Sequence, residues 1–155
     1  MSFYRTKFLL VSLTLELVLG VAAGAVEFHN LGAGGGGTAG CIAVDPRNPE
    51  IVYVGLDCGG MHVTLDGGEN WRNINNGIDS DGYAVDWNNH YGVLVLNTGR
   101  VITTTYTGQI YISDNHGQSW QKVYDAPGGL GLLIQSPHDP GTVFTASGRS
   151  LWERG

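Results

Sequence analysis

An acidic loop holds several of the residues of this sequence that could take part in chemistry. Three carboxylates, Asp79, Asp81 and Asp86, follow one another between Gly77 and Trp87. Carboxylates this close together could approach a substrate in a cleft, or bind Ca²⁺ weakly through their oxygens. The spacing lacks the ligand pattern of a full EF-hand loop. A solvated surface loop is therefore the alternative interpretation.

Aromatic side chains accompany these carboxylates. Tyr83 lies within the loop, Trp87 ends it, Tyr91 follows four residues later, and Tyr106 comes further along the chain. Aromatic faces stack on the C–H faces of sugar rings, so the pattern predicts a substrate-binding platform, with core packing as the alternative for Trp87. We expect neither a metal site nor a cofactor, because the five histidines are scattered without metal-ligand spacing. They are His29, His62, His90, His116 and His138.

A turn signature that could position such loops occurs twice, at residues 64–71 and 113–120. Each copy has Ser or Thr first, then Asp or Asn, Gly and Trp at fixed offsets, and lies between two strand-like runs. The Asp or Asn can bond nearby backbone N–H groups, Gly can take positive φ, and Trp can pin the turn to a core. The signature predicts structural hairpin turns built by Thr64, Asp66, Gly68, Trp71, Ser113, Asn115, Gly117 and Trp120.

A second repeated hairpin extends the pattern along the chain. Asp45-Pro46 with Pro49 is matched by Ser136-Pro137 with Pro140, and both are flanked by apolar runs. Short strands rich in Val, Ile, Thr and Tyr, repeating about every 40 to 50 residues, are typical of propeller blades. We therefore expect an all-β fold, a partial β-propeller of about two to three four-stranded blades.

The chain is too short to form a closed propeller by itself. Residues 26–155 supply slightly fewer than three blades at about 45 residues each, whereas propellers usually have four to eight. The sequence predicts a sector that stops within its third blade. Such a sector exposes sheet edges and core faces, so the remainder of a propeller or self-association is needed to close it.

The first 25 residues have the organisation of a secretory signal peptide. Arg5 and Lys7 precede an apolar stretch interrupted by Glu16, and small residues at 23–25 form a cleavage site. An uncleaved anchor is the alternative, although the stretch is short for a membrane span. We expect a secreted or periplasmic protein, with no membrane association after cleavage. Cleavage changes the net charge from −6 to −7, because two basic residues and one acidic residue leave. This acidic balance argues against nucleic-acid partners.

The two cysteines, Cys41 and Cys58, are an even pair, which in a secreted protein suggests a disulfide. If Val44 faces Ile51 across the hairpin, however, Cys58 lies four positions beyond the residue opposite Cys41, about 13 Å along a strand. Disulfide Cα atoms lie within about 7 Å. This register favours two separate thiols, unless a bulge at residues 59–60 shortens the distance.

The repeated turn resembles the Asp-box, or BNR, repeat of β-propellers such as sialidases, sortilins and family 74 glycoside hydrolases. The Gly-rich start, Asp45-Pro46 and the segment 53–60 also resemble the start of family 74, whose members degrade xyloglucan. That resemblance implies that Asp57 matches a catalytic aspartate, although Leu56 and Met61-His62 depart from the family's pattern. A turn-capping role for Asp57 is the alternative.

Two functional interpretations follow. Glycoside hydrolysis normally needs two carboxylates, and the family takes the second from another propeller. We therefore expect a module related to carbohydrate-active propellers that is inactive as this chain alone. The alternative is a non-enzymatic scaffold for protein binding or assembly, as in sortilins or photosystem II assembly factors. Polysaccharide or protein is accordingly the expected partner. A sialidase would need an arginine cluster for its substrate's carboxylate, and the sequence has none.

Overall fold

The computed structural model describes residues 32, 38–56, 59–79 and 90–147. These residues form strands and turns, with no α-helix among them, which confirms the all-β prediction. Within the same ranges no helix has the length and apolarity needed to cross a membrane. The strands are β1 (Ala39–Asp45), β2 (Asn48–Leu56), β3 (Gly60–Thr64), β4 (Arg72–Asn73), β5 (His90–Val95), β6 (Val101–Thr105), β7 (Gln109–Ser113), β8 (Gln121–Asp125), β9 (Leu130–Gln135) and β10 (Val143–Ser147).

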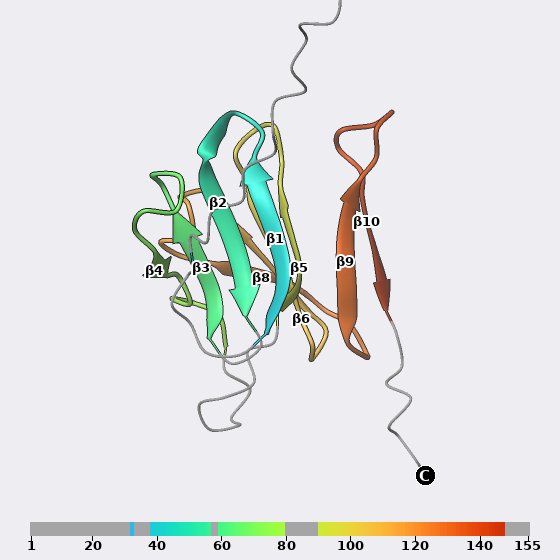
Figure 1. Ribbon diagram of the computed structural model, residues 1–155. Coiled ribbons are helices and arrows are strands. Elements are labelled where there is room, and N and C mark those ends of the chain that lie inside the picture. The colour runs from blue at the N-terminus through green and yellow to red at the C-terminus, as the bar shows by residue number, and fades with distance from the viewer. Residues whose placement is uncertain (1–31, 33–37, 57–58, 80–89, 148–155) are drawn as a thin grey trace, which may run out of the picture. The chain divides into compact units, whose positions relative to one another are not determined.

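The strands form two similar sheets and a hairpin (Figure 1). Sheet 1 has the order β1-β2-β3-β4, sheet 2 has the order β5-β6-β7-β8, and β9 pairs with β10. Every pairing is antiparallel between consecutive strands. A four-stranded antiparallel sheet of this kind is the unit of a propeller blade. The arrangement of two four-stranded sheets and one hairpin agrees with the predicted partial propeller.

The first strands of the three units lie next to one another. β1 contacts β5, and β5 contacts β9. The sheets consequently meet face to face. Successive side chains along a strand point to opposite faces of its sheet, so one set packs on the preceding unit and the other set on the following unit. This alternation makes the packing of each sheet depend on both of its neighbours.

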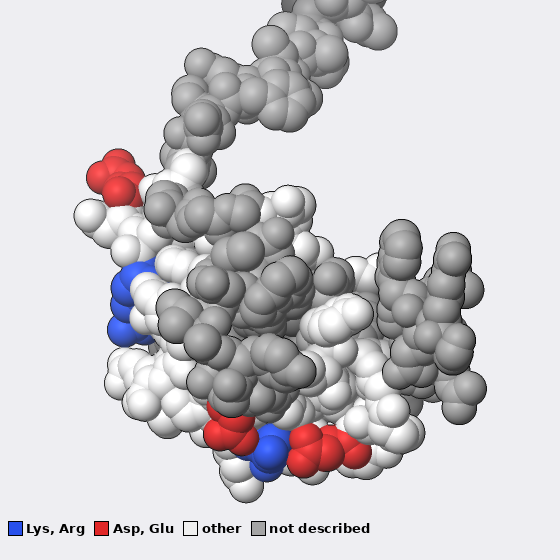
Figure 2. Space-filling view, turned by 90° about the horizontal axis from the view of Figure 1, so that it is seen from below, with Lys and Arg blue, Asp and Glu red and all other residues white. Residues whose placement is uncertain are grey.

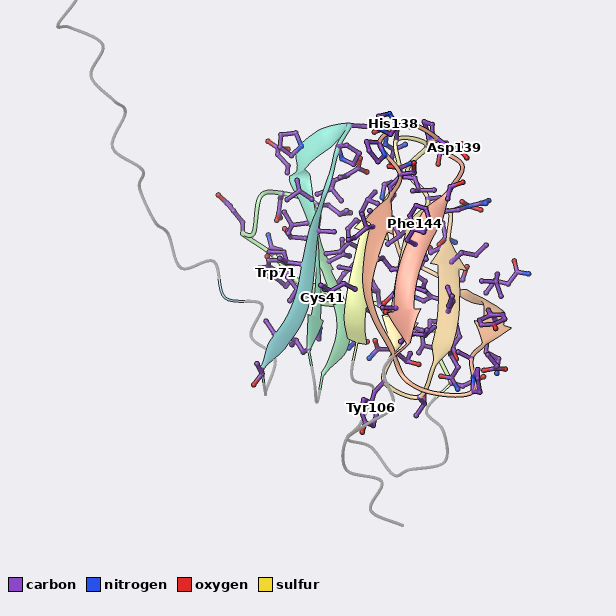
Figure 3. The ribbon with its side chains drawn as sticks, turned by 90° about the vertical axis from the view of Figure 1, so that its right-hand side faces the viewer. Cys41, Trp71, Tyr106, His138, Asp139 and Phe144 are labelled. Atoms are coloured by element: carbon purple, nitrogen blue, oxygen red, sulfur yellow. The ribbon has the colours of Figure 1, made fainter. Side chains whose placement is uncertain are left out.

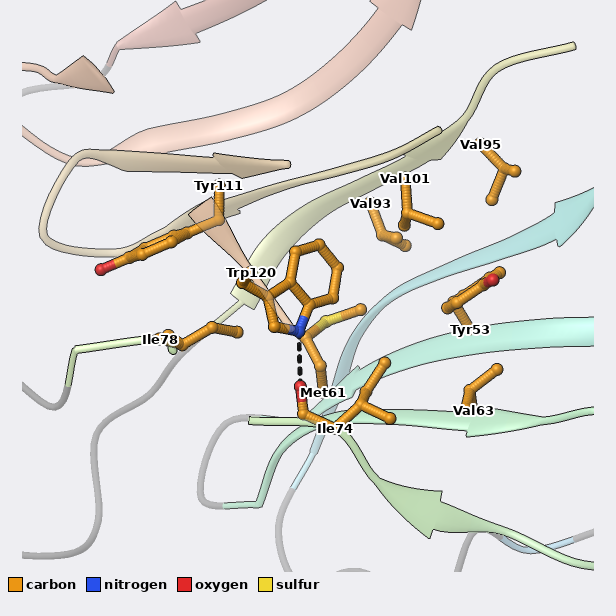
Figure 4. Close-up of a cluster of buried hydrophobic side chains, with 10 residues drawn as sticks. All are labelled: Tyr53, Met61, Val63, Ile74, Ile78, Val93, Val95, Val101, Tyr111 and Trp120. Atoms are coloured by element: carbon orange, nitrogen blue, oxygen red, sulfur yellow. Dashed lines mark hydrogen bonds between the residues drawn. The ribbon is translucent and has the colours of Figure 1, made fainter. Parts of the chain in front are cut away.

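The main hydrophobic core lies between sheets 1 and 2 (Figure 4). Tyr53, Val101 and Tyr111 are completely buried there. Each fully buried large apolar side chain contributes about 1.5–3 kcal/mol. Residues from both sheets make up the cluster: Tyr53, Met61, Val63, Ile74, Ile78, Val93, Val95, Val101, Tyr111 and Trp120.

The register of the β1–β2 hairpin differs by one residue from the sequence prediction. Val44 pairs with Val52 rather than Ile51, and Cys41 lies opposite Gly55 rather than Val54. The pairing is irregular between Val44 and Asp45, on a stretch that includes Pro49, which has no N–H to donate to a regular ladder. The expectation about Cys58 lies outside the described residues, while burial raises the pKa of the half-buried Cys41 thiol to about 11.

Candidate functional site

The two repeated turns are the best-defined polar constellations of the molecule. Turn 1 comprises residues 64–71 and joins β3 to β4, and turn 2 comprises residues 113–120 and joins β7 to β8. In turn 1 the Thr64 hydroxyl donates to Asp66 Oδ1 (2.7 Å) and accepts from the Gly68 backbone N–H (2.8 Å). The same Asp66 oxygen accepts from the Asn70 N–H (2.9 Å), and Oδ2 accepts from Asn70 Nδ2 (2.8 Å). Both carboxylate oxygens are therefore engaged within the turn.

Turn 2 repeats this network with different side chains. The Ser113 hydroxyl donates to Asn115 Oδ1 (2.9 Å) and accepts from the Gly117 N–H (3.0 Å). Asn115 Oδ1 accepts from the Ser119 N–H (3.0 Å), and Asn115 Nδ2 donates to the Ser119 hydroxyl (2.9 Å). Asn115 takes the place of Asp66, and Ser119 takes the place of Asn70. The two changes compensate each other, because the Asn115 amide donates the hydrogen bond that the Asp66 carboxylate accepts, and the Ser119 hydroxyl is its acceptor.

Electrostatics distinguish the two turns. Hydrogen bonds from Asn70, first from its side chain and then from its backbone, lower the pKa of Asp66 to about 2. Asn115 at the matching position carries no charge at any pH. The glycines of both turns have positive φ, 101° at Gly68 and 74° at Gly117, so side chains are disfavoured there.

Turn 2 is also fastened to sheet 1. Trp120 is 7% exposed, and its indole Nε1 donates to the Ile74 carbonyl (2.5 Å; Figure 4). The Trp120 N–H donates to the Asn76 carbonyl, and the Tyr53 hydroxyl bonds His116 Nδ1 (2.9 Å). The sequence predicted a tryptophan against a core, but not that this core belongs partly to the preceding sheet.

Tyr106, one residue of the predicted substrate platform, lies at the opposite end of the sheets. We call this end the loop end: it holds the β2–β3 and β6–β7 turns and the connection at residues 126–129. Tyr106 lies there, away from His138 and Asp139 (Figure 3), and is 45% exposed. Seen from this end, the visible described charges lie toward the edge of the molecule (Figure 2). An exposed aromatic ring can stack on the face of a ring-containing ligand.

Most of the proposed ligand-binding and catalytic residues lie outside the described ranges. Asp57, Tyr83 and Trp87 are among these, as are Asp81 and Asp86. The backbone of Tyr91 belongs to β5, and its side chain is not described. The described strands that flank these segments, β2, β3 and β5, have their corresponding ends at the loop end. The topology thus places at the loop end the strand ends nearest to Asp57 and to Tyr91.

Asp79 is the one member of the acidic loop within the described residues. Its carboxylate forms an ion pair with Lys122 (3.2 Å), and the same ammonium group lies 3.4 Å from Asp125. Its backbone N–H donates to the Tyr111 hydroxyl (3.1 Å). These contacts tie the start of the loop to β7 and β8.

The other described aspartates are similarly engaged. The Arg47 guanidinium binds buried Asp45 through Nε (3.0 Å) and Nη2 (2.7 Å), and lowers the pKa of that carboxyl. Arg100 pairs with Asp114 (2.8 Å), and Asp139 accepts from the Gly141 N–H (3.1 Å) and the Thr142 hydroxyl. Every aspartate in the described ranges therefore has an ion pair or a turn hydrogen bond.

Two features of the loop end were missed by the sequence interpretation. Asn73 and Asn75 both donate to the Gly59 carbonyl, and Asn75 Oδ1 accepts from the Met61 N–H (2.7 Å). The run of asparagines at positions 73, 75 and 76 was the available signal. In addition, His62 Nδ1 is buried without a hydrogen-bond partner among the described residues. No group of three or more His, Cys, Asp or Glu in those residues has the arrangement of a metal site.

Comparisons with known proteins give no family. No family model matches the chain, and no curated protein matches it. Among solved structures, it is similar to an auxiliary nutrient binding protein from Bacteroides thetaiotaomicron VPI-5482, with 13% sequence identity and a TM-score of 0.37. The match covers 73% of this chain and 36% of the other, so the chain spans about a third of that protein's length.

Proposed function

We propose that residues 26–155 form an extracytoplasmic Asp-box propeller module that binds polysaccharide at the loop end and is catalytically incomplete by itself. The proposed signal peptide, residues 1–25, directs its export. The observation that carries the proposal is that every described aspartate is held in an ion pair or a turn. A glycosidase needs two carboxylates positioned on the substrate. The described glutamates, Glu50 and Glu69, lie in or beside turn 1, at the end of the sheets opposite the loop end, while Asp57, Asp81 and Asp86 lie outside the described residues.

The aromatic residues support the choice of ligand. Tyr106 is exposed at the loop end, where β5, the strand that carries Tyr91, begins. Tyr83 and Trp87 belong to the segment of the sequence just before β5. Exposed aromatic rings bind the apolar faces of sugars without needing charge. The resemblance of the N-terminal part to family 74 glycoside hydrolases makes β-glucans, xyloglucan above all, the ligand class to test first.

The first experiment measures binding and hydrolysis on the same purified protein. Calorimetric titration with xyloglucan oligosaccharides should detect binding, and Tyr106→Ala should weaken it about tenfold, the loss of one stacking contact. Tyr124→Ala is the matched control, because Tyr124 is 54% exposed but lies on the edge strand β8. Equal losses in the two variants, or none, would exclude the loop end as the binding surface.

Hydrolysis is followed by reducing-end release from xyloglucan and other β-glucans. We expect no turnover from the wild-type chain. Robust turnover that disappears in Asp57→Ala would contradict the proposal and would identify Asp57 as one of a complete catalytic pair.

A non-enzymatic scaffold for protein binding is the second candidate function. The observation that favours it is the exposure of large apolar side chains on the outer units of the sector, with Leu132 68% exposed and Phe144 60% exposed. Apolar groups clustered on a surface mark interaction sites in soluble proteins.

A further inference from the structure

The two outer units of the sector each leave one apolar face uncovered. On β1, Cys41 and Ala43 pack against the core, whereas the alternating residues Ile42 and Val44 are 68% and 50% exposed. We call the face of sheet 1 that carries Ile42 and Val44 the head face. It points away from the core that sheet 1 shares with sheet 2, because successive side chains of a strand point to opposite faces.

The hairpin at the other end of the sector has its own uncovered face. Ile134 and Phe144 pair across β9 and β10, and they are 62% and 60% exposed. Leu132, two residues before Ile134 on β9, is 68% exposed and shares their side of the strand. We call the face formed by these three residues the tail face. Leu133, between them, points toward β5, since a Cβ on Gly92 would lie 3.3 Å from its Cγ.

The internal repeat identifies what each face is built to contact. Val44 and Val95 occupy equivalent positions in their sheets. Val44 pairs with Val52, which pairs in turn with Thr64, the first residue of turn 1. Val95 pairs with Val101, which pairs in turn with Ser113, the first residue of turn 2. Val95 is only 6% exposed, because sheet 1 covers it. The head face is thus the counterpart of a surface that is buried in sheet 2.

The tail face has a buried counterpart as well. The hairpins 45–49 and 136–140 match, which makes Ile134 and Phe144 equivalent to Ala43 and Tyr53, and those two residues are also cross-strand partners. Tyr53 is fully buried against sheet 2. Within the molecule, the face of sheet 1 that corresponds to the tail face, with Ala43 and Tyr53, therefore packs on the face of sheet 2 that corresponds to the head face, with Val95.

We propose that the tail face of one copy of this chain docks on the head face of a second copy, and so continues the sheet-to-sheet contact of sheets 1 and 2 between molecules. The occupant is a second copy because both halves of the internal contact are present, uncovered, on one chain. Such an interface is heterologous, since two different surfaces meet, and it closes into a ring or extends into a chain according to its rotation. The proposal rests on the equivalence of the propeller blades and is independent of sugar binding.

Complementation between two variants tests this arrangement. The head variant carries Ile42→Lys and Val44→Lys, and the tail variant carries Ile134→Lys and Phe144→Lys. Light scattering after gel filtration should give at least twice the monomer mass for the wild-type chain and the monomer mass for each variant alone. An equimolar mixture should restore a dimer, because the tail of the head variant still fits the head of the tail variant. Leu65→Lys, at an exposed apolar residue of turn 1, is the matched control and should assemble like the wild type.

Three results would overturn the proposal: a monomeric wild-type chain, a mixture that stays monomeric although both variants are folded by near-ultraviolet circular dichroism, or either variant assembling alone. If a lysine variant fails to fold, single substitutions Val44→Cys and Phe144→Cys replace the pair. Both carry Cys41→Ser and Cys58→Ser as well, so that each chain has a single thiol. Oxidation of their mixture should join the two variants to each other, and a bridge between two copies of one variant would contradict the head-to-tail contact. Sugar binding by a monomeric chain would leave the proposed function intact while excluding the docking.

Discussion

Turns 1 and 2 have the same internal hydrogen bonds and different surroundings. In turn 2, Trp120 is almost fully buried and donates to the carbonyl of Ile74, which directly follows β4 of sheet 1. In turn 1, Trp71 is only half-buried and Leu65 is 46% exposed. The residues of the motif are therefore sufficient to form the turn. Whether its tryptophan stabilises the fold depends on a preceding sheet against which the side chain can pack.

Replacing the tryptophans should give the largest difference between the turns. Trp120→Ala should lower the free energy of unfolding by about 3–5 kcal/mol, because it leaves a cavity in the core and the Ile74 carbonyl without its donor. Trp71→Ala should cost about 1–2 kcal/mol, since less of the side chain is buried. Urea unfolding followed by circular dichroism measures both. Equal losses would mean that the burial of the two tryptophans does not differ in solution.

Alanine at the turn glycines sharpens the comparison at the backbone. Gly117 and Gly67 both have positive φ, 74° and 70°, so either substitution costs about 1 kcal/mol in backbone strain. A Cβ on Gly117 would also clash with Ile74 Cδ1 in the buried core, whereas a Cβ on Gly67 meets nothing within 4 Å. Gly117→Ala should therefore cost about 2–4 kcal/mol in total. The same urea titration measures the difference, and a larger loss from Gly67→Ala would contradict the docking of turn 2.

The smallest expected difference between the turns is in how the stability of the protein responds to acid. The folded-state pKa of Asp66 is about 2, below its ordinary value of 3.8, so its stabilising contribution is present above pH 4 and is lost as the pH falls toward 2. Asn115 does not titrate. Asp66→Asn, which copies turn 2, should reduce the loss of stability between pH 4 and pH 2. Urea midpoints of variant and wild type across that range test this, and parallel curves would show that Asp66 is not held by Asn70 in solution.

Much of the fold was accessible from the sequence because its signals are local. Alternating Val, Ile and Thr residues predicted the strands, and the spacing from Thr64 to Trp71 predicted a hairpin turn that the structure contains. The β1–β2 register was wrong by one residue, because the pairing is irregular between Val44 and Asp45, on the stretch that includes Pro49. Of the candidate site, Asp57, Tyr83 and Trp87 remain predictions.

By itself, the sequence determined the all-β class, the repeat, and the turns whose side chains bond their own backbones. Those features depend on residues a few positions apart, where propensity and hydrogen-bonding geometry act directly. Only the tertiary structure decided that Trp120 serves sheet 1, that Lys122 pairs with Asp79, and that Tyr53 is buried while its equivalent Phe144 is exposed. These outcomes depend on which sheet packs against which face, and burial is a property of neighbours far away in the chain.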